Sequence, residues 1–222
     1  MINRLYQMVR KITLKSKRNL VQRASGKKKG VMLDIGSGAG AFLATMKTAG
    51  WNVTGLEPDE GARQVAINDF GVEARPIEDF MGLEENAVDV ITMWHVLEHV
   101  HELDAYMEKM HRLLKSDGTL LIAVPNYNSH DAKKYGEMWA AYDVPRHLYH
   151  FCATSMKALL ERHGFKLQEM KRMPFDSYYV SMLSERYKKG NLVHAFWNGF
   201  CSYWVALLNK ERCSSIIYVI KK

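Results

Sequence analysis

LDIGSGAG, residues 33–40, lies between a short apolar run and a segment with helical periodicity. The apolar run, 31–35, predicts a buried strand, and 39–49 predicts a helix that stops at Gly50. Glycine lets the chain turn tightly and lets a ligand approach the backbone. The helix that follows presents N–H groups without intrahelical partners at its first turn. The sequence therefore predicts a cofactor-binding turn between a strand and a helix.

Two classes of cofactor fit this turn. The spacing Gly36-x-Gly38-x-x-Ala41 also satisfies the Gly/Ala form of the dinucleotide fingerprint. Asp34, however, stands at the mouth of the turn, where a carboxylate repels a pyrophosphate and attracts an ammonium or sulfonium. Gly40 adds a third glycine and gives the tighter Gly-x-Gly-x-Gly form. These features favour S-adenosylmethionine, which carries both cations and no phosphate, over a nicotinamide dinucleotide.

Strands and helices alternate after the turn, which predicts a parallel sheet with helices on both faces. Asp59 precedes a helical stretch that ends near Gly71, and a further helix is expected to begin at Thr154 as its N-cap. The remaining helix is expected at 103–115, with Ser116-Asp117-Gly118 as its stop, and strands are expected at 52–56, 72–75, 87–94, 119–124, 165–171 and 215–220.

The chain has 222 residues, of which 47% are hydrophobic, enough for one sizeable core and short for two full domains. We expect one domain at 28–222, preceded by a basic, amphipathic N-terminal arm at 1–27. Within the domain, 126–151 forms an aromatic and His-rich segment expected to bind substrate. A hydrophobic helical insertion is expected at 173–213.

Six motifs together resemble the class I S-adenosylmethionine-dependent methyltransferases, in particular a bacterial branch similar to ubiquinone-biosynthesis-type O-methyltransferases. The resemblance covers about 28–172 and the last strand. It implies a Rossmann-like, doubly wound, seven-stranded α/β sheet, mostly parallel, with an antiparallel last strand. The motifs are VMLDIGSGAGAF (31–42), TGLEP (54–58), PIEDF (76–80), DVITMWHVLEH (89–99), GTLLIAVPN (118–126) and DVPRHLYHF (143–151).

The same resemblance implies which residues bind the cofactor. Glu57 takes the ribose hydroxyls, and Ile77 and Glu78 border the adenine. Trp94 and His95 lie beside the methionine moiety after the fourth strand. The methionine end of the pocket is shaped by the turn itself, namely Asp34, Gly36, Ser37, Gly38 and Gly40.

Methyl transfer to oxygen is an in-line displacement that benefits from a positioned base. His147 and His150 are the candidate bases, because imidazole titrates near neutrality and both follow the fifth strand, where open α/β sheets bind ligands. Asp143 is expected to orient one of them. The alternative is that this segment only anchors a loop.

His95-x-x-Glu98-His99 matches the inverted metalloprotease motif His-x-x-Glu-His. The motif follows an apolar strand instead of lying within a long helix, and the cofactor interpretation explains the same residues. We therefore expect no metal. Three cysteines without a Cys-x-x-Cys pair indicate a reduced, cytosolic setting and argue against a cysteine zinc site.

The segment LVHAFWNGFCSYWVALL, 192–208, is the most hydrophobic run in the chain. His194, Asn198 and Ser202 recur every four positions, so a helix here carries one narrow polar seam. Its length is at the lower limit for spanning a bilayer. Three interpretations remain open: a lid over the acceptor, a homodimer contact, and a helix in the membrane plane, with the first two favoured.

The excess of positive charge in the chain lies in the N-terminal arm. Residues 1–30 contain ten Lys/Arg and no acidic residue, so the formal net charge of +7 leaves −3 on the rest. Apolar residues fall at helical spacing along the arm: Ile2, Leu5, Val9 and Ile12. The predicted location is therefore cytoplasmic, with peripheral contact to a membrane left open. The mildly acidic body disfavours nucleic acid.

The sequence thus predicts methyl transfer from S-adenosylmethionine to an oxygen of a small-molecule or lipid-linked acceptor. Two alternatives remain at this level. One is an NAD-dependent oxidoreductase on a similar fold, and the other is a non-catalytic module that keeps the cofactor pocket.

Overall fold

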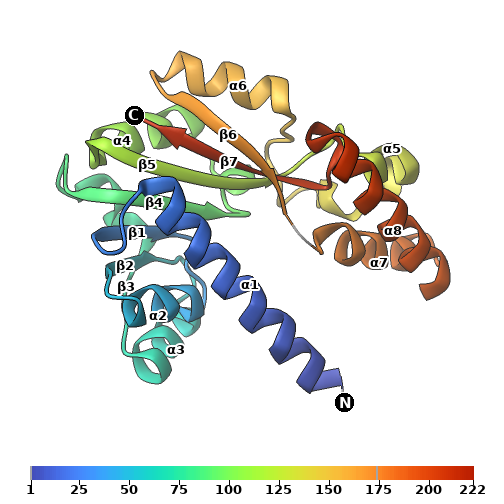
Figure 1. The fold of residues 1–222 in the computed structure, drawn as a ribbon, viewed down its shortest axis with the longest axis horizontal. Helices are drawn as coiled ribbons and strands as arrows, with labels where there is room; N and C mark the ends of the chain where they lie inside the picture. The colour runs from blue at the N-terminus through green and yellow to red at the C-terminus, as the bar shows by residue number, and fades with distance from the viewer. Residues whose placement is uncertain (1, 174) are drawn as a thin grey trace. The chain divides into compact units, whose positions relative to one another are not determined.

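The computed structural model describes residues 2–173 and 175–222, and for residues 2–7 only the course of the backbone. Seven strands form one sheet in the order β3-β2-β1-β4-β5-β7-β6 (Figure 1). The first four are parallel to one another, and the last in sequence, β7, runs antiparallel. The expected Rossmann-like fold is confirmed. The strands are β1 (Val31–Ile35), β2 (Asn52–Leu56), β3 (Glu73–Arg75), β4 (Val88–Trp94), β5 (Leu114–Pro125), β6 (Lys166–Arg172) and β7 (Ser215–Lys221).

The chain divides into two compact units. Unit 1 comprises Met1–Met93, Glu108–Leu121 and Lys221–Lys222. Unit 2 comprises Trp94–Met107 and Ile122–Ile220. Unit 1 holds the glycine turn, and unit 2 holds the His-rich segment and the hydrophobic insertion.

Most helices begin and end where local chemistry predicts. The helix α2 (Ala41–Thr48) follows the glycine turn, and α3 (Glu60–Phe70) starts at Asp59, whose side chain accepts a hydrogen bond from the Ala62 N–H. Gly71 ends α3 in the left-handed conformation. The short 3₁₀ segments are η1 (Ile77–Gly82), η2 (Leu97–His99), η3 (Gly136–Met138), η4 (Ala140–Tyr142) and η5 (Lys210–Arg212).

Two expected boundaries are wrong. Helix α4 (Leu103–Leu113) ends two residues early, and the expected Ser-Asp-Gly stop lies inside β5. The reason is tertiary, because Lys115 and Asp117 are held by ion pairs with Asp89 and Lys27. Helix α6 (Ala153–Arg162) is capped by Cys152 and not by Thr154: the Cys152 N–H donates to the Ser155 hydroxyl, and the helix starts two residues earlier.

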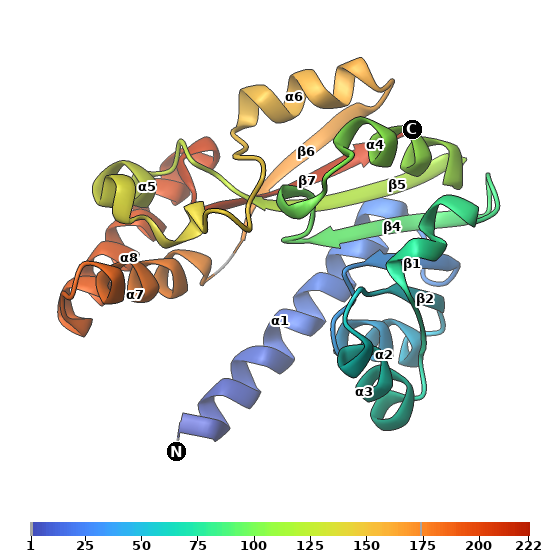
Figure 2. The same cartoon turned by 180° about the vertical axis from the view of Figure 1, so that it is seen from behind.

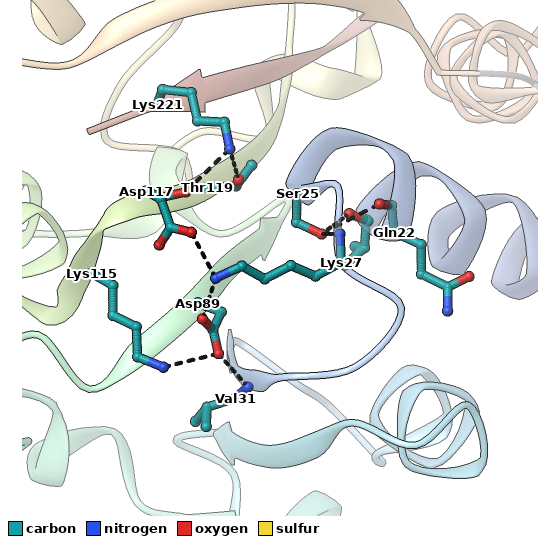
Figure 3. A network of polar contacts seen from close by, with 10 residues as sticks. Gln22, Ser25, Lys27, Val31, Asp89, Lys115, Asp117, Thr119 and Lys221 are labelled. Atoms are coloured by element: carbon teal, nitrogen blue, oxygen red, sulfur yellow. Dashed lines mark hydrogen bonds and ion pairs between the residues drawn. The ribbon is translucent and has the colours of Figure 1, made fainter.

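In unit 1 a buried carboxylate binds the first residue of β1 and the segment that leads into it (Figure 3). Asp89 of β4 accepts hydrogen bonds from the Val31 N–H at 2.8 Å, from Lys27 at 2.6 Å and from Lys115 at 3.1 Å. Lys27 also pairs with Asp117 at 2.9 Å. Burial opposes ionisation of Asp89, but these hydrogen bonds outweigh it and lower its pKa to about 2. The cluster connects the segment after helix α1 (Ile2–Ser25) to β4, which carries Asp89, and to β5, which carries Lys115 and Asp117.

The hydrophobic insertion of unit 2 folds as two helices, α7 (Asp176–Tyr187) and α8 (Leu192–Leu208), which lie with α5 (His130–Tyr135) in one group (Figures 1 and 2). The inward side of α8 is small: Ala195, Gly199, Ser202 and Ala206 are buried. A Cβ on Gly199 would lie 2.8 Å from the Tyr178 ring, so only glycine allows this approach.

Two of the three residues of the polar seam expected on α8 attach the helix to its neighbours, whereas the third, His194, is exposed. Ser202 donates to buried Asp131 of α5 at 2.9 Å, and Asn198 donates to the Tyr135 hydroxyl at 3.0 Å. Asp131 also accepts from Trp139 and from Ser214. Asn198 also donates to Glu185 of α7 at 3.3 Å, so this part of the seam faces α5 and α7 and fixes the rotation of the helix about its axis. Among the helices in the described part of the chain, none has both the length and the apolar composition needed to cross a membrane.

The expected apolar stripe of the N-terminal arm is only partly described. α1 is helical, as the spacing predicts, but the side chains of Ile2 and Leu5 lie outside the described residues. Val9 and Ile12 are exposed, whereas Val21 is fully buried. Within unit 1, therefore, the C-terminal part of α1 contributes to the core.

Asp89→Asn is expected to lower the free energy of unfolding by about 2 kcal/mol, because it removes a buried charge that faces two lysines. The lowered pKa fixes the sign of the pH dependence: the contribution is present above about pH 4 and is lost as pH falls through 2. Urea unfolding of both proteins between pH 2 and 7 measures it. Asp117→Asn, at a side chain that is 65% exposed, serves as the control and should cost less than about 1 kcal/mol. Equal destabilisation by both variants would contradict the assignment.

Candidate functional site

The glycine turn of unit 1 follows β1 and has a left-handed backbone. Gly36, Gly38 and Gly40 have φ of 74°, 54° and 78°. The turn is held by β2, because the N–H groups of Gly36 and Ser37 both donate to the Leu56 carbonyl, at 2.7 and 3.1 Å. Ser37 itself is buried. The positive φ values explain why glycine occupies these positions.

Gly38 and Gly40 differ in what surrounds them. A Cβ on Gly40 would lie 2.6 Å from the Ala66 Cβ, so this glycine lets the turn pack against α3. A Cβ on Gly38 would meet no atom within 4 Å. Gly38 thus borders open space at the carboxyl end of β1, where a ligand can approach the backbone.

Two carboxylates lie at this turn. Glu57, at the end of β2, accepts from the Gly38 N–H at 2.8 Å and from the Asp59 N–H at 3.1 Å. Asp34 is only 2% exposed and accepts from the Thr92 hydroxyl. Burial raises the pKa of Asp34 to about 7, against the hydrogen bond from Thr92 and the charge of Lys17. A cation bound at the turn would therefore stabilise the ionised form of the Asp34 carboxyl, which burial disfavours.

The expected adenine neighbours lie on η1 of the same unit. Ile77 begins this segment and is half-buried, and Glu78 is exposed. The methionine neighbours belong to unit 2: Trp94 ends β4, and His95 follows it with a φ of 59°. The His95 ring lies 3.2 Å from the Met173 Sδ and 3.4 Å from the Glu98 Oε1. Cofactor contacts of these four side chains stay predictions.

Unit 2 contains a cavity of about 220 Å³ with mixed walls. Two of the three predicted catalytic residues, Asp143 and His147, lie on it. The wall is completed by charged or polar groups (His95, Glu98, Arg146, Asp176, Tyr179, Tyr187, Ser215) and by apolar ones (Pro125, Ala140, Ala141, Val180, Leu183).

His147 is the better placed of the two candidate bases. Its Nδ1 is 2.9 Å from the Ala141 carbonyl, which only accepts, so Nδ1 carries the proton and Nε2 of the neutral ring keeps a lone pair. Burial lowers the pKa of His147, with the charge of Glu98 opposing. His150 is exposed, its Nε2 lies 3.0 Å from the Tyr142 carbonyl, and it is not part of the cavity wall.

Asp143 binds a neighbouring arginine in preference to a histidine. Its carboxylate accepts from Arg146 at 2.9 Å and lies 3.9 Å from the His147 Nε2. At that distance Asp143 is an electrostatic neighbour of His147 without a hydrogen bond to it. Its expected orienting role stays a prediction.

Sequence reasoning missed two buried acids in the cavity wall. Glu98 is fully buried, and neither carboxylate oxygen has a hydrogen-bond partner among the described residues. Burial raises the pKa of Asp176, and His95 and the hydroxyl of Ser215 oppose the shift. The His-x-x-Glu-His motif pointed to Glu98 for another reason, while nothing in the insertion marked Asp176.

One ligand-type atom from each of Glu98, His99 and His147 lies within 4.8 Å of the other two. His99 Nδ1 donates to the Arg146 carbonyl at 3.0 Å. The expectation that the chain holds no metal stays a prediction.

Comparison with known proteins assigns the family. The family model described as a methyltransferase domain matches residues 8–170, most of the chain. The chain belongs to the S-adenosylmethionine-dependent methyltransferases. This assignment confirms the resemblance and the cofactor, and it replaces the nicotinamide-dependent and non-catalytic alternatives. The glycine turn fits the cofactor through the open space at Gly38 and the buried carboxyl of Asp34.

Curated relatives match this methyltransferase over part of their length. The ubiquinone biosynthesis O-methyltransferase of Actinobacillus pleuropneumoniae serotype 5b is 35% identical over 116 residues, covering 47% of this chain and 50% of the relative. The enzyme of the same name from Cronobacter sakazakii is 30% identical over 119 residues, covering 50% and 48%. The chain thus spans about half the length of these relatives.

Solved structures share the fold at low identity. A 1,6-didemethyltoxoflavin-N1-methyltransferase of Burkholderia thailandensis, with bound S-adenosylhomocysteine, has a TM-score of 0.61 at 18% identity and covers 95% of this chain and 78% of its own. A methyltransferase from Archaeoglobus fulgidus has a TM-score of 0.63 at 20% identity, covering 96% and 94%. Likeness at this identity concerns the fold.

Gly40→Ala and Gly38→Ala are expected to separate folding from cofactor binding. Gly40→Ala should destabilise this methyltransferase by about 2–4 kcal/mol, because it adds a clash with α3 to an unfavourable φ. Gly38→Ala should cost only about 1 kcal/mol but weaken S-adenosylhomocysteine binding about tenfold or more by filling the open space. Thermal unfolding and calorimetry measure the two effects. A Gly38→Ala protein with unchanged affinity would contradict the placement of the ligand.

Cofactor binding is expected to depend on pH through Asp34. Its carboxyl is protonated below a pKa of about 7 and charged above it, so affinity for the cationic ligand should rise with pH. Below that pKa the limit is about tenfold per pH unit. Calorimetry with S-adenosylhomocysteine between pH 5.5 and about 7.5 stays below the Lys17 pKa, which burial lowers to about 8. Asp34→Asn should bind weakly and without this slope, whereas Glu57→Gln should keep it; a slope that survives Asp34→Asn would refute the role.

Proposed function

We propose that this methyltransferase methylates an oxygen atom of a small or lipid-linked acceptor bound in the cavity of unit 2. The observation that carries the proposal is the His147 ring in the cavity wall, held so that its Nε2 lone pair is free. The curated relatives, which are named ubiquinone biosynthesis O-methyltransferases, support oxygen as the target.

His147 would act as the general base. S-adenosylmethionine, when bound, supplies a methyl group on a positively charged sulfur. The His147 Nε2 would accept the proton of the acceptor O–H as the acceptor oxygen takes the methyl group, with the sulfur of the cofactor as the leaving group. The resulting imidazolium lies 4.0 Å from the Glu98 carboxylate, which stabilises its charge.

The cavity walls suit an acceptor with both polar and apolar parts. Val180 and Leu183 of α7 offer apolar surface, while Glu98 and Asp176 offer acceptors for hydroxyl donors. Because the two Glu98 oxygens accept no hydrogen bond from the described residues, a hydroxyl-bearing ligand would satisfy a buried group that is otherwise costly. The apolar surface of α7 would suit an apolar tail, and on this ground we propose a lipid-linked phenol as the acceptor class.

His147→Gln is expected to lower kcat by about 10²–10³-fold while leaving S-adenosylmethionine binding unchanged, because it removes the base. His150→Gln, at the exposed ring outside the cavity, should keep activity within about twofold. The assay follows S-adenosylhomocysteine release with phenols of increasing alkyl chain length. Since burial lowers the pKa of His147, the wild-type rate should fall with decreasing pH at a midpoint below the ordinary pKa of histidine. Full activity of His147→Gln, or an N-methylated product, would overturn the proposal.

A further inference from the structure

We propose that the outer face of α8 is a docking surface for an anionic lipid bilayer. The face consists of large apolar side chains that the fold leaves uncovered. It goes beyond methyl transfer, because binding to a membrane surface neither requires nor reports the chemistry at the cavity. Its members on α8, with their exposed fractions, are Leu192 (74%), Val193 (76%), Phe196 (66%), Trp197 (62%), Phe200 (38%), Trp204 (52%), Leu207 (40%) and Leu208 (90%).

The face is a continuous stripe along one side of the helix. Positions 193, 197, 200, 204 and 208 recur every three or four residues, which places them above one another. The rings of Trp197 and Phe200 stack at 5.9 Å, and those of Phe200 and Trp204 meet at 6.0 Å. Near the helix start, a hollow of about 370 Å³ is lined by apolar side chains alone: Leu192, Val193, Phe196 and Trp197.

The stripe cannot turn inward within unit 2. The opposite side of α8 is fastened by the Ser202–Asp131 and Asn198–Tyr135 hydrogen bonds and by the Gly199 contact with Tyr178. Rotating the helix would break these buried polar contacts and force large rings into spaces shaped for small residues. An exposed apolar surface of this extent marks an interaction site.

Charge at both ends of the stripe favours an anionic bilayer as the occupant. Arg186, Lys188 and Lys189 are exposed just before α8, and Lys210 is exposed just after it. The nearby acids do not offset them, since Glu185 is buried and Glu211 pairs with Lys157 at 3.0 Å. α8 itself carries no Lys, Arg, Asp or Glu. Apolar and aromatic rings flanked by cations are the pattern of helices that lie in the bilayer interface.

The same charges disfavour a second copy of this chain. Packing two α8 stripes side by side brings cationic ends against cationic ends in either relative direction, because both ends of the helix are basic. An anionic lipid surface meets the same cations with opposite charge. The helix is also too short and too polar on its seam to cross the bilayer, so it would lie in the interface plane.

Vesicle flotation of the full chain tests the proposal. The probe is phosphatidylcholine vesicles with and without phosphatidylglycerol, at low and high salt. We expect binding to the anionic vesicles, weakened by salt, with a blue shift of tryptophan emission. The double variant Trp197→Gln/Trp204→Gln should bind the vesicles at least about tenfold more weakly than the wild type. The triple variant Lys188→Gln/Lys189→Gln/Lys210→Gln should lose the preference for phosphatidylglycerol.

Control variants keep the outcome decisive. Phe70→Gln changes an aromatic side chain of α3 that is 37% exposed and should bind as the wild type does. Val193→Gln/Leu208→Gln replaces the tryptophan pair if that variant fails to fold. Binding that survives all α8 changes but is lost in Lys11→Gln/Lys15→Gln would transfer the contact to α1 and overturn the proposal. A concentration-dependent dimer that the tryptophan variants dissociate, without vesicle binding, would overturn it in favour of a second copy.

Discussion

The buried carboxylate of Asp89 holds the start of the sheet in unit 1. It fixes the Val31 N–H at the first residue of β1, and it neutralises lysines from the segment after α1 and from β5. A side chain on Gly30 would collide with it, since a Cβ there would lie 2.8 Å from the Asp89 Oδ2. The path of the chain into β1 therefore depends on the Asp89 carboxylate. Because β1 leads directly into the glycine turn, the position of the turn depends on this carboxylate as well.

Much of this arrangement could be predicted from short-range patterns. The strands β1 and β4 are mainly apolar runs, and Asp59 and Gly71 delimit α3 by local chemistry alone. The glycine turn could be predicted as well, because its conformation restricts the residue type. The end of α4 and the cap of α6 could not, since both depend on partners distant in sequence or on competition between adjacent polar residues.

The candidate acceptor cavity was harder to predict than the glycine turn. Asp176 stands in no distinctive spacing, and the motif that contains Glu98 suggested a metal ligand instead of a wall residue; only the folded chain brings Glu98 near His147 and Asp176 near His95. For α8 the periodicity correctly indicated a polar seam, but not which side faces the protein. Large apolar residues normally face the core; here small residues do so, because the approach of Gly199 to Tyr178 leaves no room for larger ones.

The buried Asp34 couples cofactor uptake to the proton concentration of the surroundings. Near neutral pH a fraction of the free protein carries a proton on this carboxyl, and a cation at the turn favours the ionised form. Each binding event then releases part of a proton to the solvent. The heat measured for binding consequently includes the ionisation heat of the buffer, so its enthalpy differs between buffers of equal pH while the affinity does not.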